Sequence, residues 1–190
     1  MPVRYTPPTP DQLLPVPGVT LGTAAAKVKN WERDDVLLAV FEPGTAAAGV
    51  FTRNRFCAAP VIVCRRHLDH GADIRALVVN AGNANAGTGA AGIAAAETTC
   101  AAVASMLGCG LQQVLPVSTG VIMEPLPVAK IVAALPAARA ALAADGWLAP
   151  GAMCVVETAS TEDTAVPAGF TEIDQRKYGA GKITMLRWEG

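Results

Sequence analysis

Hydrophobic residues in the first half of the chain fall into short runs of strand length. Residues 36–41 (VLLAVF) are continuously apolar, and an apolar run resumes at residues 48–52 after the turn Glu42-Pro43-Gly44-Thr45. Two such runs around a Pro-Gly turn are typical of a β-hairpin. Residues 60–64 (PVIVC) and 74–80 (IRALVVN) predict two further buried strands.

The spacing of the apolar positions changes in the second half. Apolar residues recur at steps of three to four or their multiples over residues 93–107, which predicts a helix, and Gly108 supplies its end. Residues 114–117 predict a short strand that runs into Ser118-Thr119-Gly120. Strands that come first in pairs and then alternate with helices indicate a mixed α/β domain rather than an all-parallel one.

Regular patterning weakens toward the end of the chain. A second helical region is predicted over residues 128–135, and Pro136 is expected to break or kink it because proline lacks the backbone N–H. Residues 152–156 (AMCVV) predict one more strand, and the pattern is lost after Glu157. We therefore predict an extended arm over residues 1–18, an α/β domain over 19–156 and a weakly ordered tail over 157–190.

Composition narrows the class of protein. Of 190 residues, 52% are hydrophobic and only 16% are charged, and the formal net charge is -1. A disordered chain would be richer in charge, and a nucleic-acid-binding chain would carry a basic excess, so both classes are excluded. Because alanine, glycine and valine dominate a low-charge sequence, we expect part of its surface to be covered by a partner.

Neither a targeting segment nor a metal site is expected. The proline-rich N-terminus lacks the apolar core of a signal peptide, and the uncharged stretch 76–96 holds too many asparagines and glycines to span a membrane. The five cysteines form no CxxC pair, which favours reduced, mostly buried thiols in a cytoplasmic protein. His67 and His70 form an HxxH that we interpret as two solvent-exposed histidines after a strand, not as zinc ligands.

Two loop segments are candidates for chemistry. Residues 80–87 alternate asparagine with glycine and alanine, which suits either a shaped loop around a site or a plain surface loop. They run into Gly87-Thr88-Gly89-Ala90-Ala91-Gly92, a formal GxGxxG. That match lies too far from its strand and lacks the acidic residue of a dinucleotide site, so we interpret it as a loop that caps a helix.

The second candidate is Ser118-Thr119-Gly120. A strand that ends in Ser-Thr-Gly can present a hydroxyl and an unobstructed N–H together, the donors of an oxyanion hole, although a simple strand-to-turn junction fits the same letters. With only two histidines, both in one segment, no Ser-His-Asp or Cys-His set is available. Acyl chemistry here would need another base, such as the α-amine of an N-terminal nucleophile.

Three segments together resemble one family. The segments are GVFTRNRFCAAPV at 49–61, VVNAGNANAGTG at 78–89 and LPVSTGVIMEPLP at 115–127. They are similar to signatures of the ornithine acetyltransferase (ArgJ) family, and they occur in the family's order and at about its spacing. The resemblance covers about residues 20–150. It implies a layered αββα sandwich of the N-terminal-nucleophile kind, with helices outside two sheets that contain mixed strand directions.

The resemblance also implies a function. Family members move an acetyl group from N2-acetylornithine to glutamate in arginine biosynthesis, without a cofactor, and the bifunctional ones also accept acetyl-CoA. The precursor cuts itself before a threonine that becomes the nucleophile of a β chain, and the chains assemble as α2β2. The α chain supplies the oxyanion hole, and the matching positions here are Thr119 and Gly120.

The last part of the chain departs from the family pattern. The substrate-contacting threonine of the family matches either Thr158 or Thr164, depending on the alignment, and Tyr178 stands where a lysine is expected. Thr184 lies in a segment that echoes the cleavage site, but it is too close to the preceding glycines, so the nucleophile stays unassigned. We therefore expect the isolated chain to be inactive. A diverged non-catalytic remnant and an N-terminal-nucleophile amidohydrolase or aminopeptidase are the alternatives to an α-chain role.

Overall fold

A computed structural model describes residues 16–142, 153–161, 166 and 170–189. The chain divides into two compact units, one of residues 18–143 and one that joins residues 1–17 to 144–190. Each unit is described below by itself.

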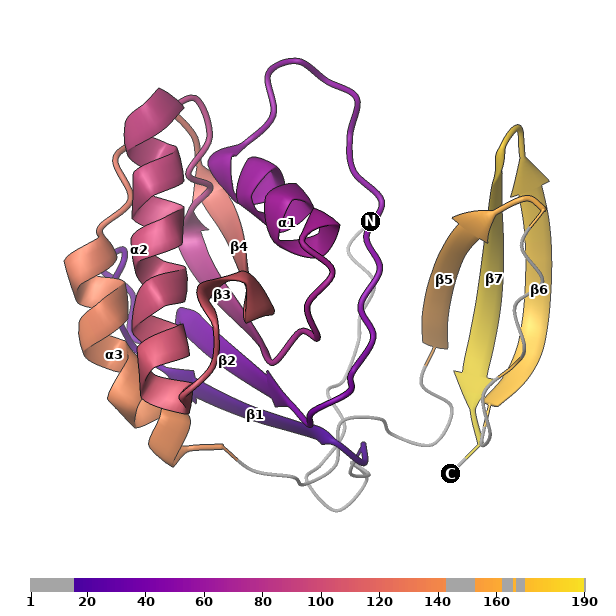
Figure 1. Ribbon diagram of the computed structural model, residues 1–190, viewed down its shortest axis with the longest axis horizontal. Coiled ribbons are helices and arrows are strands. Elements are labelled where there is room, and N and C mark those ends of the chain that lie inside the picture. The colour runs from indigo at the N-terminus through magenta and orange to yellow at the C-terminus, as the bar shows by residue number, and fades with distance from the viewer. Residues whose placement is uncertain (1–15, 143–152, 162–165, 167–169, 190) are drawn as a thin grey trace. The chain divides into compact units, whose positions relative to one another are not determined.

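A four-stranded mixed sheet forms the base of the larger unit (Figure 1). Its strands are β1 (Val19–Ala24), β2 (Val36–Phe41), β3 (Ala76–Asn83) and β4 (Val114–Val121), in the order β1-β2-β3-β4. The strand β2 runs antiparallel to both β1 and β3, whereas β3 and β4 are parallel. The predicted mixed α/β class is therefore confirmed.

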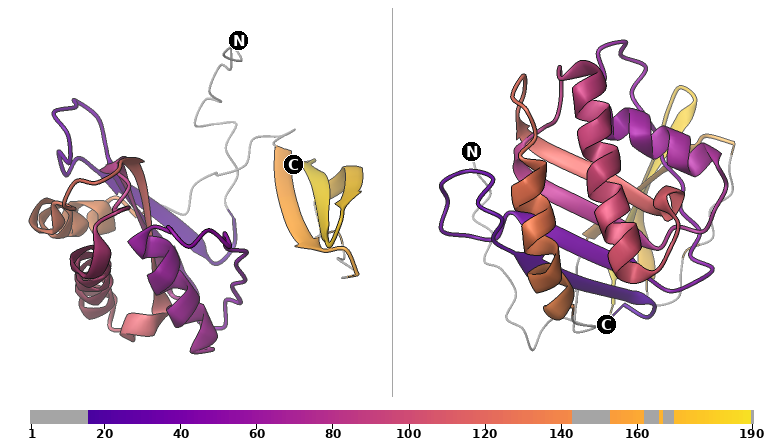
Figure 2. Two further views of the ribbon diagram at one scale, coloured as in Figure 1. Left: turned by 90° about the horizontal axis from the view of Figure 1, so that it is seen from above. Right: turned by 60° about the vertical axis from the view of Figure 1, so that its left-hand side comes forward.

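Three helices cover one face of this sheet: α1 (Ala59–Asp69), α2 (Gly89–Leu107) and α3 (Val128–Ala140). Figure 2 shows them side by side across the strands, and a 3-10 turn at Leu111–Gln113 leads into β4. The core lies between helices and sheet, where side chains that alternate along the strands are buried. Those side chains include Val36, Leu38, Ala76, Val78 and Val114, packed against Val63, Cys100, Val103, Ile131 and Leu135.

The opposite face of the sheet carries no helix within the described residues. Partners in register form two apolar rows across it. One row is Leu21, Ala39, Leu77 and Leu115, and the other is Leu37, Val79 and Val117, with the polar Thr23 at its β1 end. Val117 is 38% exposed, so part of this apolar face is open to solvent.

The sequence-based prediction of a hairpin and of a strand at 60–64 is wrong. The strand β2 pairs with β1 and β3, while residues 45–54 form no regular element. Residues 60–64 begin α1, because Pro60 suits the first turn of a helix and the buried positions Val63, Cys64 and His67 follow helical spacing. A short run rich in valine cannot by itself distinguish a buried strand from one side of a helix.

The helices α2 and α3 can be compared with the two helical regions predicted from the sequence. The helix predicted over 93–107 is confirmed and starts earlier, at Gly89, and Gly108 ends it with a left-handed φ of 68°. By length and hydropathy α2 could also cross a membrane, but here it packs on the sheet as a core helix, with six of its residues buried. Of the two outcomes expected at Pro136, a break or a kink, the break is wrong, and the further turn of helix expected after Pro136 is part of α3. The helix α3 continues to Ala140, since Pro136 faces solvent while buried residues on both sides of it hold the helix to the sheet.

The smaller unit is a three-stranded antiparallel sheet of β5 (Met153–Ala159), β6 (Phe170–Tyr178) and β7 (Gly181–Trp188), in the order β5-β7-β6. The strand β5 confirms the one predicted near 152–156 and crosses the expected boundary after residue 156. The prediction of weak order after Glu157 is wrong for β6 and β7. Most side chains of β6 are exposed on both faces, so this strand leaves no alternating pattern in the sequence.

Candidate functional site

The first half of β4 is covered along its free edge by α1. The ring of His67 lies with Nδ1 2.7 Å from the carbonyl oxygen of Val114, and the Cys64 thiol donates to the carbonyl oxygen of Pro116 over 3.1 Å. His67 is therefore buried in a helix, and the prediction of an exposed histidine after a strand is wrong. Both contacts satisfy carbonyl groups that an edge strand would otherwise leave unpaired.

These contacts also fix how the strand faces its surroundings. In a parallel pair, alternate residues direct both backbone groups toward the neighbouring strand or away from it. The carbonyl groups of Val114 and Pro116 face α1, whereas that of Val121 accepts from the N–H of Ala84, beyond the end of β3. By this alternation the N–H of Gly120 faces the free edge of the sheet.

The second half of β4 is open. Thr119 and Gly120 are exposed, and the Thr119 side chain lies on the helix-free face, in line with Val117. Within the described residues the Thr119 hydroxyl has no hydrogen-bond partner. A hydroxyl and a backbone N–H thus stand free next to each other, as the Ser-Thr-Gly segment predicts.

Gly120 can only be glycine at this place. Its φ is 137°, and a Cβ atom built on it would lie 2.3 Å from the carbonyl carbon of Gly82. Gly82 stands directly opposite in the register and itself has a φ of 98°. Two facing glycines thus hold backbone conformations that other residues rarely adopt, at the point where the free donors are presented.

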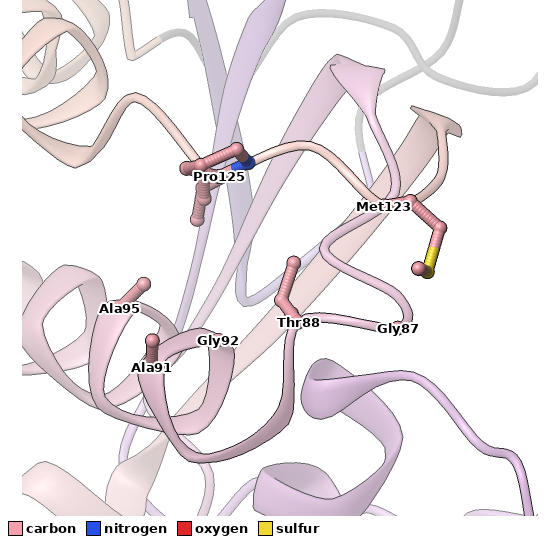
Figure 3. A pocket seen from close by; sticks show the side chains of 8 residues that line it. Gly87, Thr88, Ala91, Gly92, Ala95, Met123 and Pro125 are labelled. Carbon is pink, nitrogen blue, oxygen red and sulfur yellow. The ribbon is translucent and has the colours of Figure 1, made fainter.

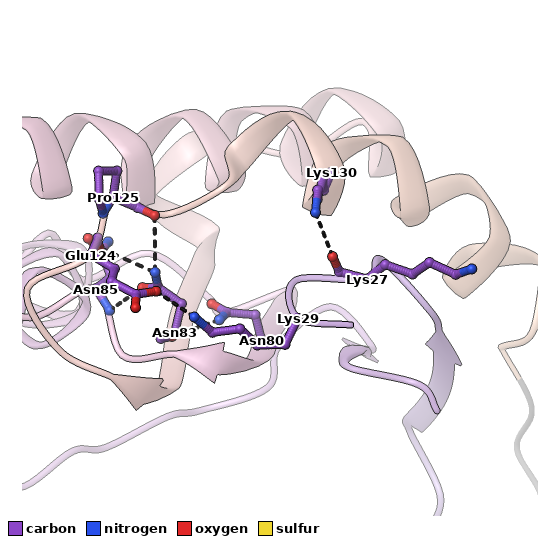
Figure 4. Close-up of polar contacts among 8 residues, drawn as sticks. All are labelled: Lys27, Lys29, Asn80, Asn83, Asn85, Glu124, Pro125 and Lys130. Atoms are coloured by element: carbon purple, nitrogen blue, oxygen red, sulfur yellow. Dashed lines mark hydrogen bonds and ion pairs between the residues drawn. The ribbon is translucent and has the colours of Figure 1, made fainter. Parts of the chain in front are cut away.

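Asparagines of the segment 80–87 hold this region together, and all three are buried (Figure 4). Asn80 Oδ1 accepts from the Ser118 hydroxyl over 2.7 Å, and Asn80 Nδ2 donates to the carbonyl of Asn83 over 2.8 Å. Asn83 Nδ2 in turn donates to the carbonyl oxygens of Glu124 and Pro125. Of the two interpretations left open for this segment, the structure favours the shaped loop.

The third asparagine organises the start of α2. Asn85 Nδ2 donates to the carbonyl of Gly92, and Asn85 Oδ1 accepts from the Thr88 hydroxyl. A Cβ atom on Gly92 would lie 2.6 Å from Asn85 Oδ1, so that glycine makes room for the asparagine. Gly92 of the formal GxGxxG thus has a packing role, whereas a Cβ atom on Gly89 would meet nothing within 4 Å.

A pocket of about 250 Å³ lies beside this loop (Figure 3). Its walls are the first turns of α2 and the segment that follows β4, and Met123 lies at one side of it. The lining residues are Gly87, Thr88, Ala91, Gly92, Ala95, Met123, Pro125 and Leu126.

The buried thiols have a structural role. Burial raises the pKa of the Cys64 thiol from 9.0 to about 11 and raises that of Cys100 further. Both thiols are therefore neutral near pH 7 and poor nucleophiles. The described residues contain no group of three or more metal-ligating side chains, and the expectation of no metal stays a prediction.

The other predicted site residues lie in the smaller unit. Thr158 pairs with Lys182 in the β5–β7 ladder, and Thr164 lies outside the described residues. Thr184 is buried in the central strand β7, where its hydroxyl accepts from Gln175 Nε2 over 3.2 Å. Nothing in this placement supports Thr184 as a nucleophile.

Sequence reasoning missed the two residues of α1 that cover β4. No local signal marks them, because the apolar run at residues 60–64 fits a strand as well as a helix. Their helical spacing, with Cys64 and His67 three residues apart, becomes visible only when the segment is extended through residue 69.

Comparison with known proteins shows the family of the chain. A sequence model of the ArgJ family matches residues 20–184. The chain belongs to the ArgJ family. The ornithine acetyltransferase of Mycobacterium tuberculosis, solved with ornithine, has a TM-score of 0.65 to this chain and is 37% identical to it. The match covers 68% of this chain and 69% of the chain in that structure.

A second ArgJ structure gives the same result. The arginine biosynthesis bifunctional protein of Bacillus halodurans has a TM-score of 0.59 at 33% identity, over 62% of this chain and 61% of that one. The expected family is therefore confirmed, and so is the mixed α/β fold of its structures. These matches support acetyl transfer in arginine biosynthesis as the chemistry of the family to which the chain belongs.

Proposed function

We propose that this chain is the α-chain part of a glutamate N-acetyltransferase that moves the acetyl group of N2-acetylornithine to glutamate. The observation that carries the proposal is the open end of β4, where the Thr119 hydroxyl and the Gly120 N–H stand free beside each other. Acetyl-CoA is a further acetyl donor in this proposal, no cofactor is needed, and the assembly is cytoplasmic.

The proposed chemistry needs these two donors. When a nucleophile attacks the acetyl carbonyl, its carbon becomes tetrahedral and its oxygen takes on negative charge. Two fixed donors stabilise that charge without having to reorganise, and one such donor contributes about 3 kcal/mol to lowering the barrier. In this scheme the hydroxyl of a β-chain threonine takes the acetyl group and ornithine leaves with the amide nitrogen. The amine of glutamate then attacks the acetyl ester, which gives acetylglutamate and frees the threonine hydroxyl.

The helix-free face of the larger sheet is the surface on which we expect a partner chain to bind. Two rows cross it, and the one that ends at Val117 lies next to Thr119 on the same face of β4, so a chain that covers this face would also be brought to the free donors. Burial of such a face stabilises an assembly by about 25 cal/mol for each Å² removed from water. We propose a β chain as this cover, within an α2β2 assembly.

The test is reconstitution. The chain is mixed with a β chain that begins at the family's catalytic threonine, together with acetylornithine and glutamate, and acetylglutamate is measured. Activity that falls about a hundredfold in Thr119→Ala supports the proposal. Acetate release without any need for glutamate would support a hydrolase instead, and a stable complex without turnover would support a non-catalytic remnant.

Binding of a partner chain to the helix-free sheet face can be tested separately from activity. Val117→Asp places a charge in an apolar row and should abolish binding of the β chain, measured by size-exclusion chromatography. Val50→Asp is the matched control, because Val50 is 73% exposed and lies outside both rows. Equal binding by both variants would contradict the assignment of this face.

A further inference from the structure

The segment that presents the free donors is fixed at both of its ends. On one side, the Ser118 hydroxyl donates to Asn80 Oδ1 over 2.7 Å. On the other side, Asn83 Nδ2 donates to Glu124 O over 3.2 Å and to Pro125 O over 3.1 Å (Figure 4). Thr119 and Gly120 lie between these two attachments.

The two attachments are joined to each other. Asn80 Nδ2 donates to the carbonyl of Asn83, so a movement of one asparagine is transmitted to the other. The side chains of Asn80 and Asn83 are 4% and 1% exposed, which keeps water from replacing these bonds. Asn83 Oδ1 also accepts from the N–H of Asn85 over 2.8 Å, which fixes the orientation of its amide.

The donor segment needs such a constraint. Glycine explores far more backbone conformations than other residues, and Gly82 and Gly120 face each other with φ values of 98° and 137°. Two facing glycines would allow the peptide before Gly120 to rotate if only the ladder held it. A donor that must first reorient contributes less to stabilising a developing oxyanion.

We propose that Asn80 and Asn83 are positioning residues that together set the direction of the Gly120 N–H and the place of the Thr119 hydroxyl. They do not touch the reacting atoms and act through β4 and the segment after it. This inference rests on the proposed acyl-transfer function, but its structural half concerns the 190-residue chain alone and can be tested there.

The activity test uses the chain assembled with its β chain. Asn83→Asp keeps the acceptor for Asn85 but removes both donated bonds, and Ser118→Ala removes the bond to Asn80. We expect kcat to fall about thirtyfold in Asn83→Asp and about fivefold in Ser118→Ala, with KM for acetylornithine unchanged within twofold. Val78→Ala is the matched control, since Val78 is equally buried on the same face of β3 and makes none of these bonds. It should lower thermal stability and leave kcat unchanged.

The structural test measures amide hydrogen exchange by NMR in the isolated chain. Exchange at the hydrogen-bonded amides of Ala84 and Met123, which tie the segment after Gly120 to the neighbouring loop, should accelerate at least tenfold in Asn83→Asp, and much less in Val78→Ala. If Asn83→Asp does not fold, Ser118→Ala takes its place in both measurements.

The outcomes separate the two claims. An inactive wild-type assembly overturns the proposed function, while the exchange data still decide the positioning role. Exchange at Ala84 and Met123 that is the same in Asn83→Asp and Val78→Ala overturns the positioning role. So does an active assembly in which KM rises and kcat is unchanged.

Discussion

The two halves of β4 have the same neighbour on one side and different neighbours on the other. Along residues 114–116 the free edge is covered by α1, whose Cys64 and His67 contact the carbonyl groups of Pro116 and Val114. Along residues 118–121 the edge is open, and Gly120 has a φ of 137°. An edge strand normally needs protection, so a strand left open over only one half indicates that this half serves another purpose.

The two halves of β4 also differ in what their contacts contribute. In the covered half, side chains satisfy backbone groups and are themselves buried. In the open half, the asparagines hold the backbone from the helix-covered side and leave the donors free. Substitutions in the covered half should therefore act on stability, whereas those in the open half should act on the proposed reaction as well.

The largest effect on stability is expected at Gly120. In Gly120→Ala the added Cβ meets the backbone of Gly82 at 2.3 Å and the residue must hold a φ of 137°. We expect the free energy of unfolding to fall by at least about 3 kcal/mol in urea denaturation. The matched control is Gly108→Ala, where φ is 68° and no atom lies within 4 Å. Its cost should stay near 1 kcal/mol, and an equal cost in both variants would contradict the close strand contact.

A smaller effect is expected in the covered half. His67→Leu keeps the size of the side chain but leaves the Val114 carbonyl buried without its partner. The free energy of unfolding should fall by about 2 kcal/mol. His70→Leu, at the exposed end of the same helix, should change it by less than about 0.5 kcal/mol. Turnover of the assembled enzyme should be unaffected in both, and a loss of turnover in His67→Leu would show that the two halves are not independent.

The smallest effect concerns pH. Burial raises the pKa of Cys64 from 9.0 to about 11, so the unfolded chain loses this proton at lower pH than the folded chain does. Between pH 9 and 11 the folded state binds more protons, and the stability from Cys64 is lost as pH rises through this range. Stability measured against pH should fall less steeply in Cys64→Ala than in the natural chain. Identical slopes would show that the thiol is not shielded by α1.

Several elements could be predicted from the sequence alone. The strand 36–41, the helix ending at Gly108 and the strand leading into Ser118-Thr119-Gly120 each have a local pattern that agrees with their tertiary surroundings. Segment 60–64 does not, because an apolar run of five residues fits a strand and the first turns of a helix equally well. Pro136 misled for a related reason, since packing on both sides of it outweighed its local preference.

The candidate site was predicted by residue type but not by arrangement. The sequence points to Thr119 and Gly120 as donors, and to the asparagine-rich segment as either a loop around a site or a surface loop. It could not show that Asn80 lies opposite Ser118, because these residues are brought together only by the parallel register of β3 and β4.

By itself, the sequence determined the family, the mixed α/β class and the residues that present a hydroxyl beside an unhindered N–H. These depend on short contiguous motifs and on the absence of a Cβ atom at Gly120. Only the tertiary structure decided which half of β4 is open, which face of the sheet is free of helices, and which asparagines hold the donors. These depend on contacts between residues far apart in the chain, where hydrogen bonds and packing outweigh local preference.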